Sequence, residues 1–376
     1  MLDLEKIALL VASRMGPLLA DHRRCTRIRS PLSKCSLCQE LCPVQALSFH
    51  QGEGISFADS CLECGLCAAV CPTGALKIQE PTEMNLLQKI EALGENGAAV
   101  ALGCRRNREL DQGVLTVPCL GSLSREFLLL LDGLPFPVYL IHNEETCSGC
   151  PVTKGGELCR ERLKELRSFQ EGLGLASFSI KNVGQVPGKV FSRKRAASGL
   201  GRRAFFRSLW GGARKVPLMA LESFLNGETE KEKGITELPG LKADRLAFLQ
   251  RALLPVHSPA PIPFLAQPFL RQACHFCRAC VVLCPVGALK CEVDGDHYRL
   301  LLHQNLCTGC GLCAQVCYHE SLELAPAAVA HVKREEPLVL AQGEKKSCSI
   351  CGQEMIISGP AEECFLCRKK ALLDAN

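Results

Sequence analysis

The chain has 376 residues, of which 26 are cysteine, one is tryptophan and three are tyrosine. This length predicts two to four domains rather than one core, and the many cysteines indicate an interior organised partly by metal. The formal net charge of +5 counts every thiol as neutral. Thiolates bound to metal would make the protein more acidic, so overall charge gives no support to nucleic-acid binding.

Neither a membrane span nor a secretory segment is expected. The best apolar run, 128–141, is interrupted by Asp132, Gly133 and two prolines, and it falls short of the roughly 18 apolar residues of a spanning helix. Asp3 and Glu5 interrupt what would be the apolar core of a secretory segment. We therefore expect a reducing cytoplasm, where the cysteines serve as ligands rather than disulfides.

The N-terminal part is predicted to contain a helix and then a repeated unit. Apolar residues recur at helical spacing within residues 1–20. Residues 21–80 hold two copies of one phrase, CPVQAL at 42–47 and CPTGAL at 71–76. The second copy completes a C-x2-C-x2-C-x3-C-P run, the spacing at which bacterial proteins hold [4Fe–4S] clusters. The cysteines of this run are Cys61, Cys64, Cys67 and Cys71.

The first unit lacks one regular cysteine. In such runs three thiolates bind one cluster and the fourth binds its neighbour. One cluster is therefore predicted on Cys61, Cys64, Cys67 and Cys42. The other has Cys35, Cys38 and Cys71, but Leu32 stands where the first cysteine is expected. Cys25 is the predicted substitute, because a longer loop costs little entropy; the alternative is a [3Fe–4S] site with Cys25 merely buried.

Residues 86–185 alternate short apolar runs with helical patterns, which predicts a small α/β domain with a parallel sheet. Its runs end at or near three cysteines, and a fourth follows at CxxC spacing. These are Cys104, Cys119, Cys147 and Cys150. Groups that follow parallel strands meet at the carboxyl edge of the sheet, so four thiols are expected to converge. Three occupants stay open: a [2Fe–2S] cluster, a Cys147–Cys150 dithiol with a lowered pKa, and a structural zinc or simply reduced thiols.

Residues 186–269 are predicted to be a linker that is basic at first, contains helical pieces from residue 217, and is Pro-rich at 255–268. The segment 181–216 has ten Lys or Arg and no acidic residue. A solvated linker is one interpretation. The other is a docking surface for an acidic redox partner or an anionic membrane, with Phe206 and Trp210 as apolar anchors.

Residues 270–326 repeat the cysteine run twice and form the second predicted unit. One cluster is predicted on Cys274, Cys277, Cys280 and Cys317, and the other on Cys307, Cys310, Cys313 and Cys284. Between the runs, Asp294-Gly295 predicts a hairpin. Tyr318 replaces the proline that follows the other fourth cysteines, which restores a backbone N–H near the sulfur. Hydrogen bonds to cluster sulfurs tune potential, so the two clusters are predicted to differ.

Residues 345–370 are predicted to be a zinc ribbon. The spacing CxxC-x12-CxxC suits tetrahedral zinc held by four thiolates, with rubredoxin-like iron as the alternative. The four cysteines are Cys348, Cys351, Cys364 and Cys367. A metal here would fold a short segment that has little core of its own.

These motifs are similar to those of known iron–sulfur proteins. Each repeated unit resembles a bacterial-type two-cluster ferredoxin domain, and the chain resembles multi-cluster 4Fe-4S ferredoxin-type proteins that serve redox enzymes. The resemblance implies that the clusters act as one-electron relays. The middle domain also resembles the small cysteine-bearing delta-subunit domain of some hydrogenase–heterodisulfide reductase assemblies, which implies a [2Fe–2S] cluster. Its spacings differ from that domain, and Cys159 is left over as an expected inert core residue.

Together the patterns predict an α+β multidomain protein in which two ferredoxin-like units flank the small α/β domain and a zinc ribbon follows. Four [4Fe–4S] clusters and one zinc are the expected cofactors, and a [2Fe–2S] cluster is one of the open occupants of the middle cysteines. The predicted function is a cytoplasmic electron carrier, or a non-catalytic subunit, that relays single electrons between redox protein partners of the oxidoreductase, hydrogenase or dehydrogenase type.

Two other functions stay open. One is an oxidoreductase subunit with a thiol or [2Fe–2S] site in the middle domain. The other is a redox-sensing or assembly factor. No nucleic-acid partner is expected, whereas peripheral membrane contact stays open through the basic segment.

Overall fold

The computed structural model describes residues 18–50, 54–95, 97–110, 113–175, 179–184 and 244–374. Helices and strands are mixed throughout this part, as the sequence predicts. Most of the predicted N-terminal helix and most of the basic segment, with Phe206 and Trp210, lie outside the described residues. No helix in the described ranges is long and apolar enough to cross a membrane.

The first repeated unit is built from short helices and two small antiparallel sheets, β1 with β4 and β2 with β3. Cysteines are part of its core beside Leu47, Ile55 and Leu76. Its elements are β1 (Leu18–Ala20), η1 (His22–Arg24), α2 (Thr26–Arg29), α3 (Leu37–Glu40), β2 (Leu47–His50), β3 (Gly54–Phe57), α4 (Leu66–Val70) and β4 (Leu76–Ile78).

The expectation of a helix that reaches residue 20 is wrong at its end. Residues Leu18–Ala20 form β1, which pairs antiparallel with β4, with Leu18 opposite Ile78. Leu18 is buried in the core of the unit. Pairing with a distant strand thus decides the conformation here, and local periodicity carries no signal of that partner.

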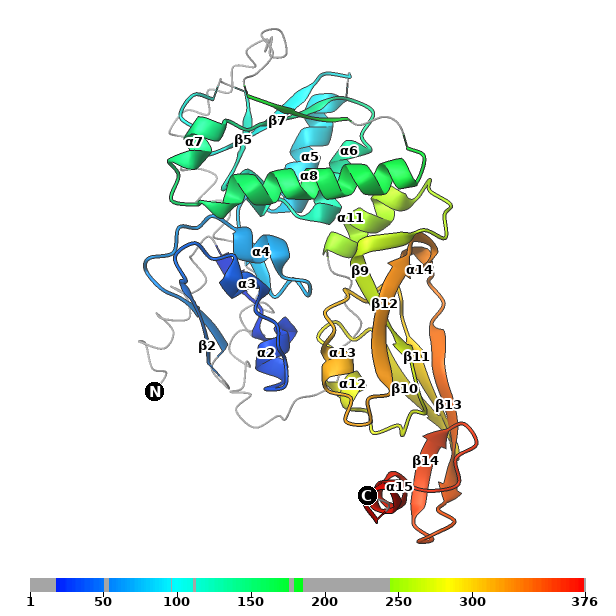
Figure 1. Ribbon diagram of the computed structural model, residues 1–376. Helices are drawn as coiled ribbons and strands as arrows, with labels where there is room; N and C mark the ends of the chain where they lie inside the picture. Colours follow the sequence, from blue (N-terminus) through cyan, green and yellow to red (C-terminus); the bar gives the residue numbers. More distant parts are fainter. Residues whose placement is uncertain are drawn as a thin grey trace, which may run out of the picture.

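The middle part contains a four-stranded sheet in the order β6-β5-β7-β8, with every pair parallel. Helices cover it, and α6 and α8 supply much of the largest hydrophobic core. Figure 1 shows the long helix α8 lying across the molecule above the first unit. The elements are α5 (Glu83–Gly94), β5 (Val100–Cys104), β6 (Leu115–Val117), η2 (Leu120–Ser122), α6 (Arg125–Asp132), β7 (Val138–Ile141), α7 (Glu144–Ser148), α8 (Lys154–Gly172) and β8 (Ile180–Val183).

In the region expected to hold helical pieces and then a Pro-rich connector, the structure describes one helix and, in place of the connector, a strand. Helix α11 (Asp244–Leu253) packs on α6, with the rings of Phe127 and Phe248 5.2 Å apart. Strand β9 (Pro261–Leu270) pairs antiparallel with β12 (Leu322–Ala328). A proline tolerates a strand where its missing N–H faces away from the partner. In this two-stranded sheet both strands are edges, so the prolines do not prevent pairing.

The second repeated unit continues directly into the C-terminal residues. One sheet has the order β10-β11-β13-β14, so a strand preceding the last cysteine group pairs with the hairpin of the second unit. The predicted hairpin turn is present at Gly295, whose φ is +58°. The elements are α12 (Ala279–Val282), β10 (Leu289–Asp294), β11 (His297–Leu302), α13 (Leu312–Gln315), α14 (Val329–Lys333), β13 (Leu338–Ser347), β14 (Glu354–Ser358) and α15 (Phe365–Asp374).

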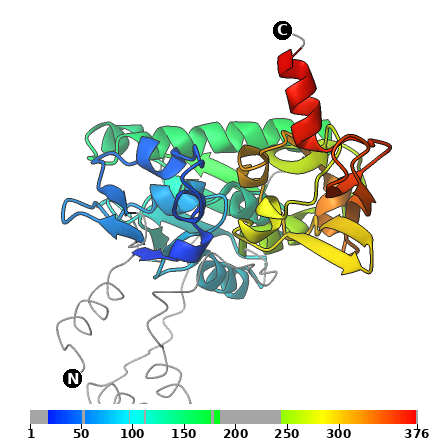
Figure 2. The ribbon, with the colours of Figure 1, turned by 90° about the horizontal axis from the view of Figure 1, so that it is seen from below.

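The two repeated units lie side by side beneath α8. Figure 2, a view from below, shows the first unit and the second unit along this helix, with α15 projecting from the second unit past α8. The units touch through α2, where Arg29 donates to the backbone of residues 282 and 283. The cysteine-rich faces of both units therefore belong to one body.

Candidate metal centres

All 26 cysteines are free thiols, and those of the motifs gather in groups. We name five groups by their members. Set A is Cys25, Cys35, Cys38 and Cys71; set B is Cys42, Cys61, Cys64 and Cys67; set C is Cys274, Cys277, Cys280 and Cys317; set D is Cys284, Cys307, Cys310 and Cys313. The middle set is Cys104, Cys119, Cys147 and Cys150.

Set A brings Cys25 to the three regular cysteines. Burial, together with the nearby thiols of Cys71, Cys35 and Cys25, raises the pKa of the Cys38 thiol to about 12. Cys25 precedes α2 and is buried, whereas Leu32 is 60% exposed. Cys25 thus lies near the other three cysteines of set A, whereas Leu32, which occupies the expected sequence position, faces solvent.

In set B, Cys42 lies near Cys61 and Cys64, which is compatible with the predicted crossed ligand set. Burial raises the pKa of Cys64, with Cys42 and Cys61 as thiol neighbours that raise it further. Burial also raises the pKa of Cys67, and Cys38 of set A is among its neighbours. The two sets of the first unit are therefore adjacent.

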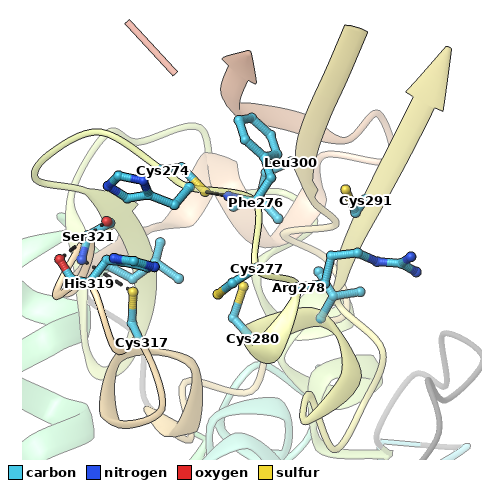
Figure 3. Close-up of a pocket in the computed structure, with 13 residues that line it drawn as sticks. Cys274, Phe276, Cys277, Arg278, Cys280, Cys291, Leu300, Cys317, His319 and Ser321 are labelled. Carbon is cyan, nitrogen blue, oxygen red and sulfur yellow. Dashed lines mark hydrogen bonds between the residues drawn. The ribbon is translucent and has the colours of Figure 1, made fainter. Parts of the chain in front are cut away.

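Set C surrounds a cavity, and its four sulfur atoms lie around that space in Figure 3. Burial raises the pKa of Cys274 to about 11, with Cys277 and Cys317 as thiol neighbours. Set D is more deeply enclosed. Burial raises the pKa of Cys313 well above its usual value, and Cys280 of set C is among its thiol neighbours. Each repeated unit thus holds two adjacent sets.

One hydrogen bond recurs at the four crossing cysteines. In each copy the backbone N–H four residues after the cysteine donates to its sulfur at 3.2 or 3.3 Å. The donors are Ala46 to Cys42, Ala75 to Cys71, Ala288 to Cys284 and Ser321 to Cys317. Such bonds favour the thiolate and tune a bound cluster. Cys317 keeps this bond without a following proline, and an additional donor from Tyr318 stays a prediction.

The middle set lies where the parallel sheet predicts it. Cys104 is the last residue of β5, and Cys119 directly precedes η2. Cys147 lies in α7, and Cys150 follows that helix. All four line one cavity, as the four cysteines of set C do. Cys104 and Cys119 share a hydrogen bond, which lowers the pKa of Cys104 to about 6.

Two glycines make room for these thiols. Gly155 and Gly156 lie in the first turn of α8. A Cβ at Gly155 would stand 2.4 Å from Cys119 Sγ, and one at Gly156 would stand 3.2 Å from Cys147 Sγ. A real Cβ does not approach another atom as closely as 2.4 Å, so a side chain at Gly155 would displace Cys119, and one at Gly156 would be tight against Cys147. The donor set and this cradle fit a small sulfur-bound group.

His142 was missed by the sequence argument. It directly follows β7, is buried, and lines the same cavity. Its Nε2 has no hydrogen-bond partner within the described ranges, and a Cβ at Gly156 would stand 2.7 Å from it. Burial lowers its pKa, as does Arg160. The rule that located the cysteines, a residue at the carboxyl end of a parallel strand, would also have located this histidine.

The remaining thiols differ in chemistry. Burial raises the pKa of Cys147, with Cys104 and Cys150 adding to the effect, and this direction does not favour a reactive dithiol. Cys159 is 1% exposed, and burial raises its pKa to about 12. A thiol of this kind is expected to be inert.

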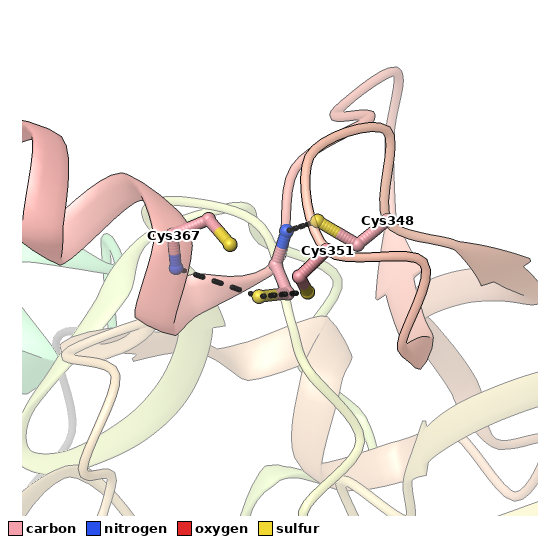
Figure 4. A group of neighbouring side chains, drawn as sticks. Cys348, Cys351 and Cys367 are labelled. Atoms are coloured by element: carbon pink, nitrogen blue, oxygen red, sulfur yellow. Dashed lines mark hydrogen bonds between the residues drawn. The ribbon is translucent and has the colours of Figure 1, made fainter.

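The last four cysteines form the tightest group. The Sγ atoms of Cys348, Cys351, Cys364 and Cys367 all lie within 4.8 Å of one another, and within the described part of the chain no other ligand group meets this limit. Cys351 Sγ and Cys364 Sγ are 3.8 Å apart, and a tetrahedral site with zinc–sulfur bonds of 2.3 Å has an edge of about 3.8 Å. Figure 4 shows the sulfurs converging between β14 and α15.

Backbone donors prepare this group for a cation. Hydrogen bonds from the backbone at Cys351 and Cys364 lower the pKa of Cys348 to about 6, and the Cys364 N–H lies 3.2 Å from Cys348 Sγ. Its thiol thus ionises near neutral pH, as a metal ligand must.

Comparison with known protein families matches two stretches of the chain. Residues 33–75 match the 4Fe-4S dicluster domain, and residues 301–323 match the 4Fe-4S binding domain. The chain carries two 4Fe-4S ferredoxin-type domains. These matches support a multi-cluster 4Fe-4S ferredoxin-type protein. The first match begins after Cys25, and the second begins after the run at 274–284. A comparison with curated proteins finds no match.

Proposed function

We propose that this iron–sulfur electron-transfer protein is a polyferredoxin-type carrier, or the carrier subunit of an oxidoreductase complex, with one [4Fe–4S] cluster on each of sets A to D. The observation that carries the proposal is the gathering of sixteen motif cysteines into four groups of four. When bound, such a cluster accepts and donates single electrons.

The chain contributes four things to that chemistry. Its thiolates hold the clusters, and its apolar core excludes water from them, because cysteines of the sets are packed among buried leucines, valines and alanines. The recurring N–H donors place positive dipole ends on the sulfurs. Pairing of adjacent sets within a unit shortens the path between centres.

A [2Fe–2S] cluster is the proposed occupant of the middle set. Cys104 and Cys119 share a hydrogen bond, and Cys147 interacts electrostatically with both Cys104 and Cys150, so four thiols are available as two ligands on each of the two irons of such a cluster. A single tetrahedral zinc needs four sulfurs at mutual distances of about 3.8 Å. The middle set does not meet the 4.8 Å limit that the C-terminal group meets.

Zinc is the proposed occupant of the C-terminal group, where the sulfur spacing fits one tetrahedral ion. The proposed partners are redox proteins in a reducing cytoplasm. A location of that kind is supported by the 26 free thiols.

Metal analysis of anaerobically purified protein tests the proposal. Four cubanes and the middle cluster predict about 18 irons per chain with matching acid-labile sulfide and one zinc. About 16 irons would remove the middle cluster from the proposal, and about 15 with a [3Fe–4S] EPR signal would remove Cys25 as a ligand. Little iron together with several zincs would refute electron transfer.

A further inference from the structure

We infer that the five iron–sulfur sites form one ordered path, from the middle set through sets B, A and D to set C, and that two buried arginines hold its two joints. Arg162 holds the joint between the middle domain and the first unit. Arg29 holds the joint between the two units. The inference rests on the proposed function and adds the order of the centres and the residues that fix it.

The first joint connects the middle set to set B. Cys119 and Cys64 share one buried hydrophobic cluster with Leu66, Val152 and Leu158. The thiol of Cys64 also acts electrostatically on Cys119. The middle set is thus a neighbour of set B, at an end of the first unit, rather than a bridge between the two units.

Arg162 crosses this joint from helix α8. Its side chain is 1% exposed, and it donates to the carbonyls of Gly121 at 3.1 Å and Ala69 at 3.2 Å, and to that of Leu123. Gly121 lies two residues after Cys119, and Ala69 lies two residues after Cys67. One guanidinium therefore holds the backbone beside a cysteine of each set.

The second joint connects set A to set D. The thiol of Cys35 acts electrostatically on that of Cys310, across the boundary between the two units. The neighbouring backbone is tied by a hydrogen bond of 2.9 Å from Lys34 N to Gln315 Oε1. Set A of the first unit and set D of the second unit are therefore neighbours.

Arg29 crosses the second joint from helix α2. It is 6% exposed, and its Nε donates to Leu283 O at 3.0 Å while its Nη2 donates to Val282 O. These carbonyls directly precede Cys284 of set D, whose thiol also acts electrostatically on Arg29. Helix α2 begins directly after Cys25 of set A. The two joints therefore share one design, a buried arginine that donates to backbone carbonyls beside cluster ligands.

Contacts within the units complete the order. Cys67 of set B and Cys38 of set A lie in one buried cluster of the first unit and interact electrostatically. In the second unit, Cys280 of set C shares a buried cluster with Cys284 and Cys307 of set D, with Cys313 packed against it. Electron tunnelling weakens steeply with separation, so transfer follows neighbours along this order. Removing a buried guanidinium leaves desolvated carbonyls without hydrogen-bond donors. The distance between the metal sites on either side is then no longer fixed.

The test compares Arg29→Gln with Arg23→Gln in the full chain. Arg23 lies in the same segment, and its side chain is 75% exposed. Iron, sulfide and zinc are measured first. EPR spectra of the fully reduced proteins then report magnetic coupling between clusters. We expect Arg29→Gln to keep its iron but to lose the coupling between the two units, whereas Arg23→Gln retains it.

The outcomes separate this inference from the proposed function. A wild-type protein without the iron for four cubanes refutes the proposed function itself. Two results overturn the inference about Arg29 but leave the proposed function standing. One is full iron content with no magnetic coupling between the units in the wild type, and the other is unchanged coupling in Arg29→Gln. If Arg29→Gln loses iron, Gln315→Ala removes the milder contact with Lys34. We then expect weaker coupling between the units, and unchanged coupling overturns the inference.

Discussion

A glycine-to-alanine substitution is expected to have opposite effects on stability at the two ends of helix α8. Gly155→Ala and Gly172→Ala place the same methyl group at the two ends of one helix. At Gly155 the Cβ would stand 2.4 Å from Cys119 Sγ, whereas at Gly172 nothing lies within 4 Å. The first change therefore disturbs the middle set, and the second tests helix propensity alone.

The magnitudes follow from the two environments. Gly172→Ala is expected to stabilise the protein by up to about 1 kcal/mol, because alanine loses less backbone entropy in a helix. Gly155→Ala has a similar or smaller gain near the helix start, but overpacking costs about 1–3 kcal/mol. Because the contact is with a cluster ligand, displacement of Cys119 should also remove the middle cluster.

Iron analysis, EPR and thermal unfolding check this pair. Gly155→Ala should retain about 16 irons, lose the [2Fe–2S] signal and unfold at a lower temperature than the wild type. Gly172→Ala should keep every cluster and unfold at the same or a higher temperature. A Gly155→Ala protein with an intact [2Fe–2S] signal and undiminished stability would refute the placement of Cys119 in the site.

Three further predictions concern other cysteines. Cys25→Ser should convert the set A cluster to a [3Fe–4S] form with its EPR signal, and an unchanged [4Fe–4S] content would show that Cys25 is not a ligand. Removal of zinc by a chelator should speed the loss of iron from set C in air, because Ser358 is hydrogen-bonded to Cys274 in both directions; equal loss rates with and without the chelator would contradict this. Cys159 should resist alkylation at pH 8 in the folded protein, since burial keeps its pKa near 12 and the thiol protonated. Mass spectrometry of labelled thiols measures this, and labelling as fast as in denatured protein would be the contrary result.

The spacing of residues along the sequence predicted those features that depend on nearby residues. The cysteine runs indicated which thiols should gather, and the rule for parallel strands placed Cys104 and Cys119 at one sheet edge. Pairing between distant segments could not be predicted in this way. Strand β1 depends on β4, and β9 depends on β12 some fifty residues away. Their own sequences read as a helix end and a Pro-rich connector.

The joints between the units were equally beyond local reasoning. Arg29 lies in a short segment with four arginines, of which Arg24 is also buried and Arg23 faces solvent, and composition does not separate them. The role of Arg29 depends on carbonyls more than 250 residues further along the chain. Arg162 likewise sits in a highly charged helix, where a solvent-facing side chain would have been the ordinary expectation.

The sheet shared by the second unit and the C-terminal cysteines has a consequence for biosynthesis. Translation produces the set C run at 274–280 well before Ser358, which caps the backbone of Cys274 in the finished fold. Strand β13 can join the sheet only after the β10–β11 hairpin exists, because it pairs with β11. Set C is therefore open on one side while the chain is being made. Insertion of the proposed cluster can therefore precede the folding of the segment that carries the last four cysteines, which then covers the open side of set C.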